Sequence, residues 1–210
     1  MAKLEIIGIP ASTYVRAVRM ACEEKGVAYE LSPAMPHAPE VLAIHPFGKI
    51  PVLRHGDVTL CESKAIATYI DRSFDGPPLF PEDPRELAQA EQWVSLVNTV
   101  IDRDLVRLYL FAYIFPKTAD GKPDRPVIEN ATPAVQQHIA LLDRALAETG
   151  YLAGKCYGFA DVNLMPILAY VRQFPEAAAA LGKAPRLAGF YERNAARPSF
   201  KNTIPPPPPR

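Results

Sequence analysis

The sequence predicts two units: an α/β domain of βαβ-ββα order at the N-terminus, followed by an all-α domain. Residues 1–76 mix short β-branched runs with helical spacing, whereas residues 85–203 show helical spacing without strand-like alternation. Residues 77–84 between them hold four prolines, which neither a helix interior nor a central strand accepts. This middle segment is therefore predicted to be a linker.

The first elements follow from local patterns. Residues 3–9 are short and β-branched and predict a strand. Residues 12–25 have apolar residues at helical spacing, and Gly26 supplies a C-terminal stop. Residues 27–31 predict a second strand, and the proline-rich residues 32–46 are expected to be mostly loop. A strand–helix–strand order implies a parallel pair of strands.

The rest of this unit is predicted to be a hairpin and a helix. Residues 50–54 and 58–61 predict two strands around His55-Gly56-Asp57, which is a turn signal. Residues 63–74 carry an amphipathic helical pattern. The hairpin therefore adds antiparallel strands to the sheet that the parallel pair begins.

The second unit is predicted to be helical throughout. Residues 85–115 form one long helical pattern, and residues 116–126 form a charged loop that contains proline. The remaining helices are expected at residues 133–149, 161–172, 175–181 and 185–196. Residues 204–210 contain five consecutive prolines and are predicted to be a polyproline tail with no core to join.

Composition excludes several classes of function. The 23 basic and 23 acidic residues balance to a formal net charge of +0, so no basic surface is expected for nucleic acid. Apolar runs fall far short of the ~20 residues that a membrane span needs. Glu5 interrupts the stretch that a signal peptide would keep apolar, so a cytoplasmic location is expected.

The cysteines and histidines predict neither a disulfide framework nor a metal site. Three cysteines are too few and too scattered for a framework. The four histidines (His37, His45, His55 and His138) lack metal-binding spacing. No nucleotide-binding glycine motif is present, so no cofactor beyond the substrate is expected.

Four stretches resemble one family. They read PASTYVR at residues 10–16, HPFGKIPVL at 45–53, LCESKAI at 60–66, and YLAG followed by FADV between residues 151 and 162. In this order, and within a βαβ-ββα pattern followed by helices, they are similar to the glutathione S-transferases, especially the serine-type phi class and its bacterial relatives. His45 stands where the family usually has Asn.

The resemblance covers nearly the whole chain. It implies a thioredoxin-like N-terminal domain that binds glutathione, an all-helical C-terminal domain, and a homodimer with Phe47 and the helices near residues 63–74 and 85–115 at its interface. It also implies activation of the glutathione thiolate for attack on a hydrophobic electrophile, as in detoxification. The alternatives are a transferase-like scaffold without activity, or a glutathione-dependent isomerase, dehalogenase or peroxidase.

Ser12 is the candidate catalytic residue, and it is also expected to bind glutathione. It ends a strand and opens a helix, so its hydroxyl and the first N–H groups of the helix converge. Lowering a thiol pKa from ~8.5 by ~2 units needs ~2.7 kcal/mol of preference for the thiolate. A hydrogen bond to a charged group supplies ~1.5–3 kcal/mol and a helix N-terminus ~0.3–2 kcal/mol. Thr13 could take this role if the turn is shifted by one residue, and Ser12 could also be only a helix cap.

The glutathione backbone is expected to lie along Ile50 and Pro51. The family implies a cis bond between them that turns the Ile50 backbone toward the bound peptide, as a strand edge binds a peptide. An ordinary trans proline at a strand edge is the alternative. Lys49 is placed to pair with one carboxylate of the tripeptide, unless it is a plain loop lysine. His37 is a further candidate for a similar contact.

Glu62 and Ser63 follow a strand and begin a helix. Ser63 is expected to be the N-cap, and the free N–H groups of that helix suit the γ-glutamyl carboxylate. Glu62 would pair with the α-ammonium group. A plain cap beside a solvated Glu is the alternative. Asp161, three residues after Gly158, is expected to have the structural role of capping a helix.

The second substrate is expected between this site and the long helix. Tyr14, inside the helix that Ser12 opens, is expected to pack or to face this cleft. Tyr109 and Tyr113 are the candidates on the long helix, where Phe111 and Phe115 also lie. One helix cannot turn all four aromatic rings to one side, because residues two apart face different directions.

Overall fold

A computed structural model gives the structure of the chain and describes residues 3–207. The N-terminal domain is a four-stranded mixed sheet with the order β2-β1-β3-β4. Strand β1 (Leu4–Ile7) pairs in parallel with β2 (Tyr29–Ser32) and antiparallel with β3 (Val52–His55). Strand β3 forms an antiparallel hairpin with β4 (Val58–Cys61). The predicted βαβ-ββα topology is confirmed.

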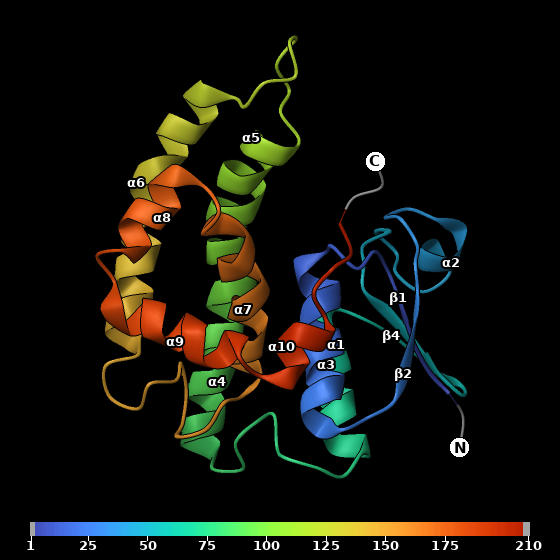
Figure 1. Cartoon of the computed structure of the whole chain (residues 1–210). Coiled ribbons are helices and arrows are strands. Elements are labelled where there is room, and N and C mark those ends of the chain that lie inside the picture. Colours follow the sequence, from blue (N-terminus) through green and yellow to red (C-terminus); the bar gives the residue numbers. More distant parts are fainter. Residues whose placement is uncertain (1–2, 208–210) are drawn as a thin grey trace.

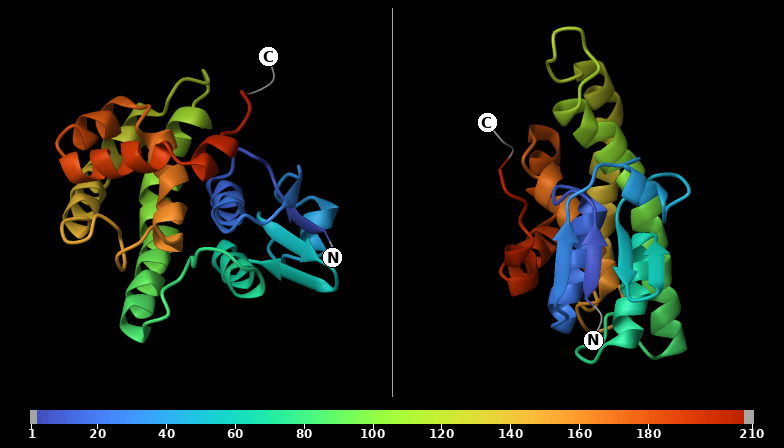
Figure 2. Two further views of the ribbon diagram at one scale, coloured as in Figure 1. Left: turned by 60° about the horizontal axis from the view of Figure 1, so that its bottom comes forward. Right: turned by 90° about the vertical axis from the view of Figure 1, so that its right-hand side faces the viewer.

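Helices α1 (Thr13–Lys25) and α3 (Ser63–Ser73) cover one face of this sheet, and the short α2 (Pro39–Leu42) covers the other (Figure 2). The two central strands, β1 and β3, carry buried residues on both faces. Ile6 and Leu53, which are paired in register, pack toward α1 and α3, whereas their neighbours Ile7 and Val52 pack with Val41 of α2.

The C-terminal domain is built around one long helical rod (Figure 1). Helix α4 (Pro84–Leu96) continues into the π-helical segment η1 (Val97–Leu110) and then into α5 (Phe111–Ile114), and the residues at both junctions keep right-handed helical angles. A single helix was expected here, and the π-helical winding of its middle was not. Pro84 lies in the first turn of α4, because proline needs no N–H bond at that position.

Helix α6 (Arg125–Ala145) corrects one predicted boundary. The sequence places its start at Pro133, but the helix begins eight residues earlier, where the Asp124 side chain accepts a hydrogen bond from the N–H of Val127. Pro133 therefore lies inside a helix. A proline can start a helix or interrupt one, and only the upstream cap distinguishes the two cases.

The remaining helices are α7 (Phe159–Val171), α8 (Pro175–Leu181), α9 (Pro185–Ala195) and α10 (Pro198–Asn202). Helix α7 is buried on almost every side and packs against α1, α4, η1 and α9. Its start is capped as predicted, because the two carboxylate oxygens of Asp161 accept hydrogen bonds from the N–H groups of Leu152 (2.9 Å) and Gly158 (3.0 Å).

The two domains share one hydrophobic core. Helix α1 packs against α7, and α10 lies on α1, where the Arg16 guanidinium donates to the Phe200 carbonyl at 3.2 Å. Arg19 of α1 also donates to the carbonyls of Asn202 and Thr203. Contact between the domains therefore fixes the N-terminal end of α1 relative to the long helical rod.

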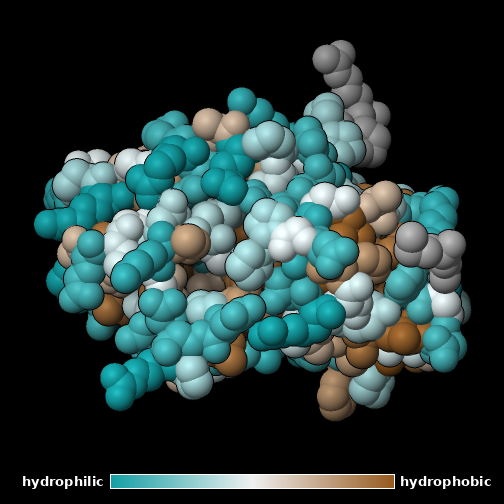
Figure 3. Space-filling view, turned by 90° about the horizontal axis from the view of Figure 1, so that it is seen from below, coloured by the Kyte–Doolittle hydropathy of each residue, from teal (hydrophilic) through white to brown (hydrophobic). Residues whose placement is uncertain are grey.

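Two segments without regular structure connect or follow these helices. Residues 74–83, between α3 and α4, contain neither helix nor strand, and Pro84, the last residue of the predicted linker 77–84, begins α4. Residues 204–207 extend from α10 without regular structure, and the end of the predicted polyproline tail, residues 208–210, lies outside the described residues. Seen from below, the helical domain presents a mostly hydrophilic surface, and hydrophobic residues gather more on the side of the N-terminal domain (Figure 3).

Candidate active site

A cavity of about 870 Å³ lies between the loops of the N-terminal domain and the helical rod η1–α5. It brings together eight of the ten site residues predicted from the sequence. In the chain, the first and the last of these eight are more than fifty residues apart. These are Ser12, Tyr14, His37, Lys49, Ile50, Pro51, Glu62 and Ser63.

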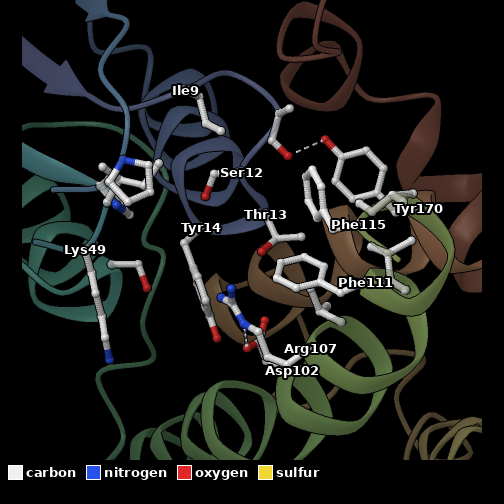
Figure 4. Close-up of a pocket in the computed structure, with 18 of the residues that line it drawn as sticks. Ile9, Ser12, Thr13, Tyr14, Lys49, Asp102, Arg107, Phe111, Phe115 and Tyr170 are labelled. Carbon is white, nitrogen blue, oxygen red and sulfur yellow. Dashed lines mark hydrogen bonds and ion pairs between the residues drawn. The ribbon is translucent and has the colours of Figure 1, made fainter. Parts of the chain in front are cut away.

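Ser12 is the N-cap of α1. Its backbone is extended, and its hydroxyl oxygen accepts a hydrogen bond from the N–H of Val15 at 3.4 Å. The turn before it depends on Gly8, because a Cβ there would lie 2.6 Å from Cγ2 of Val15. Tyr170 of α7 donates to the carbonyl of Ala11 at 2.9 Å (Figure 4). The helical domain thus holds the turn that carries Ser12.

The Ile50–Pro51 peptide bond is cis, as predicted, and comes directly before β3. The preceding loop packs against the loop of His37. The His37 N–H donates to the Gly48 carbonyl at 2.8 Å, and Gly48 has a φ of +62°. A Cβ on Gly48 would lie 2.3 Å from Nδ1 of His37, so only glycine allows these two loops to approach so closely.

The start of α3 differs from the prediction. Glu62, not Ser63, is the N-cap residue, and Ser63 is the first residue of the helix. Glu62 has a φ of +69°, an unusual angle for a residue other than glycine. Such strained positions often mark functional sites. Its side chain is 69% exposed, whereas Ser63 is buried beside it.

His45 supports this corner, a role that the sequence did not predict. The ring is buried, and its Nδ1 accepts a hydrogen bond from the N–H of Phe47 at 3.1 Å. Its Nε2 lies 3.4 Å from Oε1 of Glu62. Since Nδ1 is an acceptor, the proton is on Nε2 and faces the carboxylate.

The other half of the cavity comes mainly from the helical rod. Residues at intervals of four form two columns along it, and such spacing places side chains on one side of a helix. One column is Asn98, Asp102, Val106, Leu110 and Ile114, and the second is Arg107, Phe111 and Phe115. Figure 4 shows Arg107, Phe111 and Phe115 facing the side of the cavity that carries Ser12 and Tyr14.

Tyr109 and Tyr113, which the sequence predicts at the second-substrate site, do not line this cavity. The hydroxyls of both donate to Oε2 of Glu176, at 2.9 Å and 2.6 Å, and Tyr109 is fully buried. Phe111 and Phe115 lie on the cavity side instead. Phe111 and Phe115 continue the column that Arg107 begins, whereas Tyr109 and Tyr113 belong to neither column.

Tyr14 faces the boundary between the two halves. Its hydroxyl lies 3.4 Å from the carbonyl oxygen of Asn98. Burial and the neighbouring Asp102 raise the pKa of Tyr14 well above its usual range, so the phenol keeps its proton at neutral pH. Asp102 accepts a hydrogen bond from Nε of Arg107 at 2.9 Å. Neither partner of this ion pair was predicted.

Within residues 3–207, no helix is both long and apolar enough to span a membrane. Within the same range, no group of three or more His, Cys, Asp or Glu side chains could hold a metal ion.

Comparison with known proteins agrees with this arrangement. Residues 6–78 match the family model for the glutathione S-transferase N-terminal domain, and residues 105–198 match the model for the C-terminal domain. The chain is 32% identical to glutathione S-transferase 3 of Zea mays, across 99% of this chain and 98% of that protein. The chain therefore belongs to the glutathione S-transferase family.

Solved structures show the same fold. Glutathione transferase F7 of Populus trichocarpa superimposes with a TM-score of 0.85 and 29% identity, covering 95% of this chain and 97% of that one. Glutathione S-transferase I from maize, solved with an atrazine–glutathione conjugate, has a TM-score of 0.85 and 26% identity and covers 96% of each chain.

Proposed function

We propose that this glutathione transferase binds glutathione in the N-terminal half of the cavity and uses Ser12 to stabilise its thiolate. The observation that carries this proposal is the convergence of Ser12, the cis Ile50–Pro51 edge and the Glu62–Ser63 corner on one cavity. The backbone of Ile50 offers its donor and acceptor to the tripeptide, as a strand edge does. Ser63 and the first turn of α3 receive the γ-glutamyl carboxylate, and Glu62 pairs with the α-ammonium group.

Two further contacts complete the glutathione site in this proposal. Lys49 pairs with the glycine carboxylate of the tripeptide, and His37 lies beside it across Gly48. The Ser12 hydroxyl already accepts a hydrogen bond from the helix, so its own proton is available to donate to sulfur. The thiolate then attacks the electrophile, a carbon–sulfur bond forms, and the leaving group departs with the electron pair.

Two measurements test this function. The chain is expected to bind a glutathione affinity resin and to be eluted by free glutathione. It is also expected to accelerate conjugation of 1-chloro-2,4-dinitrobenzene over the uncatalysed rate. Failure to bind the resin would favour a scaffold without activity. Binding without conjugation would favour isomerase, dehalogenase or peroxidase chemistry, each of which has its own assay.

The proposal includes a cytoplasmic homodimer. Phe47 is 71% exposed on the loop that follows α2, with Met35 and Leu42 exposed on the same part of the domain. Large exposed apolar side chains that gather in one place mark interaction surfaces. A dimer that covers Phe47 would also fix the loop that holds His45. Sedimentation of the purified chain is expected to give twice the mass of 23.1 kDa, and a stable monomer would contradict this part.

A further inference from the structure

The half of the cavity that the helical domain supplies carries one ion pair among mostly apolar side chains. The carboxylate of Asp102 is 7% exposed, whereas the guanidinium side chain of Arg107 is 48% exposed. The acid is thus buried and the cation is presented to the cavity, although the pair as a whole is neutral. Lys49 is the other lysine or arginine among the described residues that line the cavity, and it belongs to the opposite wall.

Arg107 is held in place from two directions. Its Nε donates to Oδ2 of Asp102 at 2.9 Å, and its guanidinium carbon lies 5.1 Å from the ring centroid of Phe111. Within residues 3–207, Nε provides the one polar contact that its guanidinium makes. The N–H groups on the two terminal nitrogens are therefore free to bind a ligand in a fixed geometry, which suits a carboxylate.

The winding of η1 creates this pair. Asp102 and Arg107 are five residues apart, and the hydrogen bonds of a π-helix join residues at that interval. In an α-helix, neighbours on one face are three or four residues apart. The π-helical turn therefore brings the two charges together on the cavity side, and π-helical turns are frequent at functional sites.

The second oxygen of Asp102 does not reach Arg107. Oδ1 is buried and, among the described residues, has no donor at full hydrogen-bond distance, and the Tyr14 hydroxyl is a neighbouring donor. Buried carboxylate oxygens are rarely left without a donor. A ligand in this half of the cavity therefore meets the free donors of Arg107, next to the rings of Phe111 and Phe115 (Figure 4).

We propose that Arg107 makes this enzyme select aromatic electrophiles that carry a carboxylate at the end remote from the reacting carbon. The aromatic ring would pack against Phe111 and Phe115, and the carboxylate would bind the terminal nitrogens of Arg107. This inference rests on the proposed function, because it names the substrate class of the same site.

The test compares two substrates that differ in one charge, 4-chloro-3,5-dinitrobenzoate and its methyl ester. In both reactions the glutathione thiolate attacks the ring carbon that bears chlorine, a C–S bond forms, the C–Cl bond breaks and chloride leaves. The thiol proton goes to solvent. The measured quantity is the ratio of kcat/KM for the acid to kcat/KM for the ester. Comparing this ratio between variants cancels the intrinsic reactivity of each substrate.

Three variants of the ion pair are expected to change the acid-to-ester ratio of kcat/KM in different ways. Arg107→Gln should lower the acid-to-ester ratio about tenfold, as loss of a charged hydrogen-bond donor implies. Arg107→Lys keeps the charge without the planar fork and should give an intermediate ratio. Asp102→Asn removes the competing negative charge and should raise the ratio severalfold.

Arg103→Gln is the matched control. Arg103 lies on the same helix and pairs with Asp104, but it does not line the cavity. Its ratio should equal that of the wild type. Circular dichroism of each variant checks that the fold is retained, and Arg107 is exposed enough for substitution to be tolerated.

The outcomes separate the two proposals. A wild-type protein that conjugates the ester, together with an Arg107→Gln ratio within twofold of wild type, would overturn the role of Arg107 and leave the transferase function standing. A wild-type protein that conjugates neither substrate and does not bind the glutathione resin would overturn the proposed function itself.

Discussion

Nε2 of His45 lies 3.4 Å from Oε1 of Glu62, so a buried ring in one loop supports an exposed carboxylate at the start of α3. The same ring accepts the N–H of Phe47 through Nδ1. One side chain thus joins the loop that precedes the cis bond to the corner where α3 begins. Both segments belong to the proposed glutathione site.

Replacing His45 with Ala is therefore expected to weaken glutathione binding. The N–H of Phe47 loses its acceptor, which costs ~1–3 kcal/mol of stability, and the Glu62 corner loses its support. We expect a KM for glutathione about tenfold higher, with a smaller change in kcat. His138→Ala is the control, since His138 is also buried but binds Asp104 away from the cavity. An equal rise of KM in both variants would contradict a local role.

Ser12→Ala tests the source of thiolate stabilisation. Loss of a hydrogen bond to a charged group costs ~1.5–3 kcal/mol, or ~1–2 units in the pKa of the bound thiol. The ultraviolet absorbance of the thiolate, followed against pH in the glutathione complex, measures this shift. Thr13→Val is the companion variant. A raised thiol pKa in Thr13→Val, with none in Ser12→Ala, would assign the role to Thr13.

Gly48→Ala tests the close approach of two loops. Its Cβ would lie 2.3 Å from Nδ1 of His37, in addition to the ~1 kcal/mol strain of a left-handed backbone. We expect both lower stability and a raised KM for glutathione. Gly121→Ala is the control, because Gly121 has a similar φ of +68° but no atom lies within 4 Å of an added Cβ. It should therefore show the backbone strain alone, and a normal glutathione KM.

Phe111→Ala and Tyr113→Phe test which aromatic residues of the rod contact the electrophile. Phe111 lines the cavity, so its removal should raise the KM for an aryl chloride several-fold, as loss of buried aromatic surface predicts. Tyr113→Phe removes a hydroxyl that binds Glu176 outside the cavity. That variant should lower the free energy of unfolding by ~0.5–1.5 kcal/mol and keep the KM for the electrophile. The reverse pattern would place the second-substrate site on the other side of the rod.

The stability of the protein should depend on the ionisation of Asp161. Burial raises the pKa of Asp161 to about 7, against the opposing effect of the N–H groups of Gly158 and Leu152. Its unfolded pKa is about 3.9. The folded state therefore binds more protons between these values, and this contribution to stability is lost as pH rises through about 7.

Denaturant unfolding of the wild type and Asp161→Asn checks that sign. The variant lacks the titrating group and one acceptor. The difference in unfolding free energy between the two proteins should be smaller at pH 8 than at pH 5, by ~1–3 kcal/mol. A difference that stays the same from pH 5 to pH 8 would show that Asp161 is ionised throughout this range and would contradict the raised pKa.

Much of the glutathione half could be predicted from the sequence because short-range patterns define it. Ser12 follows a strand and opens a helix, and the segment around Pro51 is a contiguous motif. The exact cap of α3 could not be predicted, because Glu62 adopts a positive φ that tertiary contacts impose. Ser63 has the better intrinsic capping preference, and the surrounding structure overrode it.

The helical half was harder to predict because it depends on which face of a helix meets the cavity. Aromatic residues at 109, 111, 113 and 115 are chemically similar in the sequence. The contacts of Tyr109 and Tyr113 with Glu176, more than sixty residues away, pack that face against α8 and away from the cavity. The pairing of Asp102 with Arg107 depends on the π-helical winding of η1. The sequence predicts an ordinary helix over residues 85–115, in which residues five apart are not paired.

The helical rod has a consequence for how this enzyme can diversify. One continuous segment, from Asn98 to Phe115, supplies most of the helical wall of the cavity, while the proposed thiol chemistry depends on loops of the other domain. Substitutions at four-residue intervals along one helix can therefore reshape this wall while leaving the residues of the proposed thiol chemistry untouched. Selection can act on the two halves of the reaction separately, within a single fold.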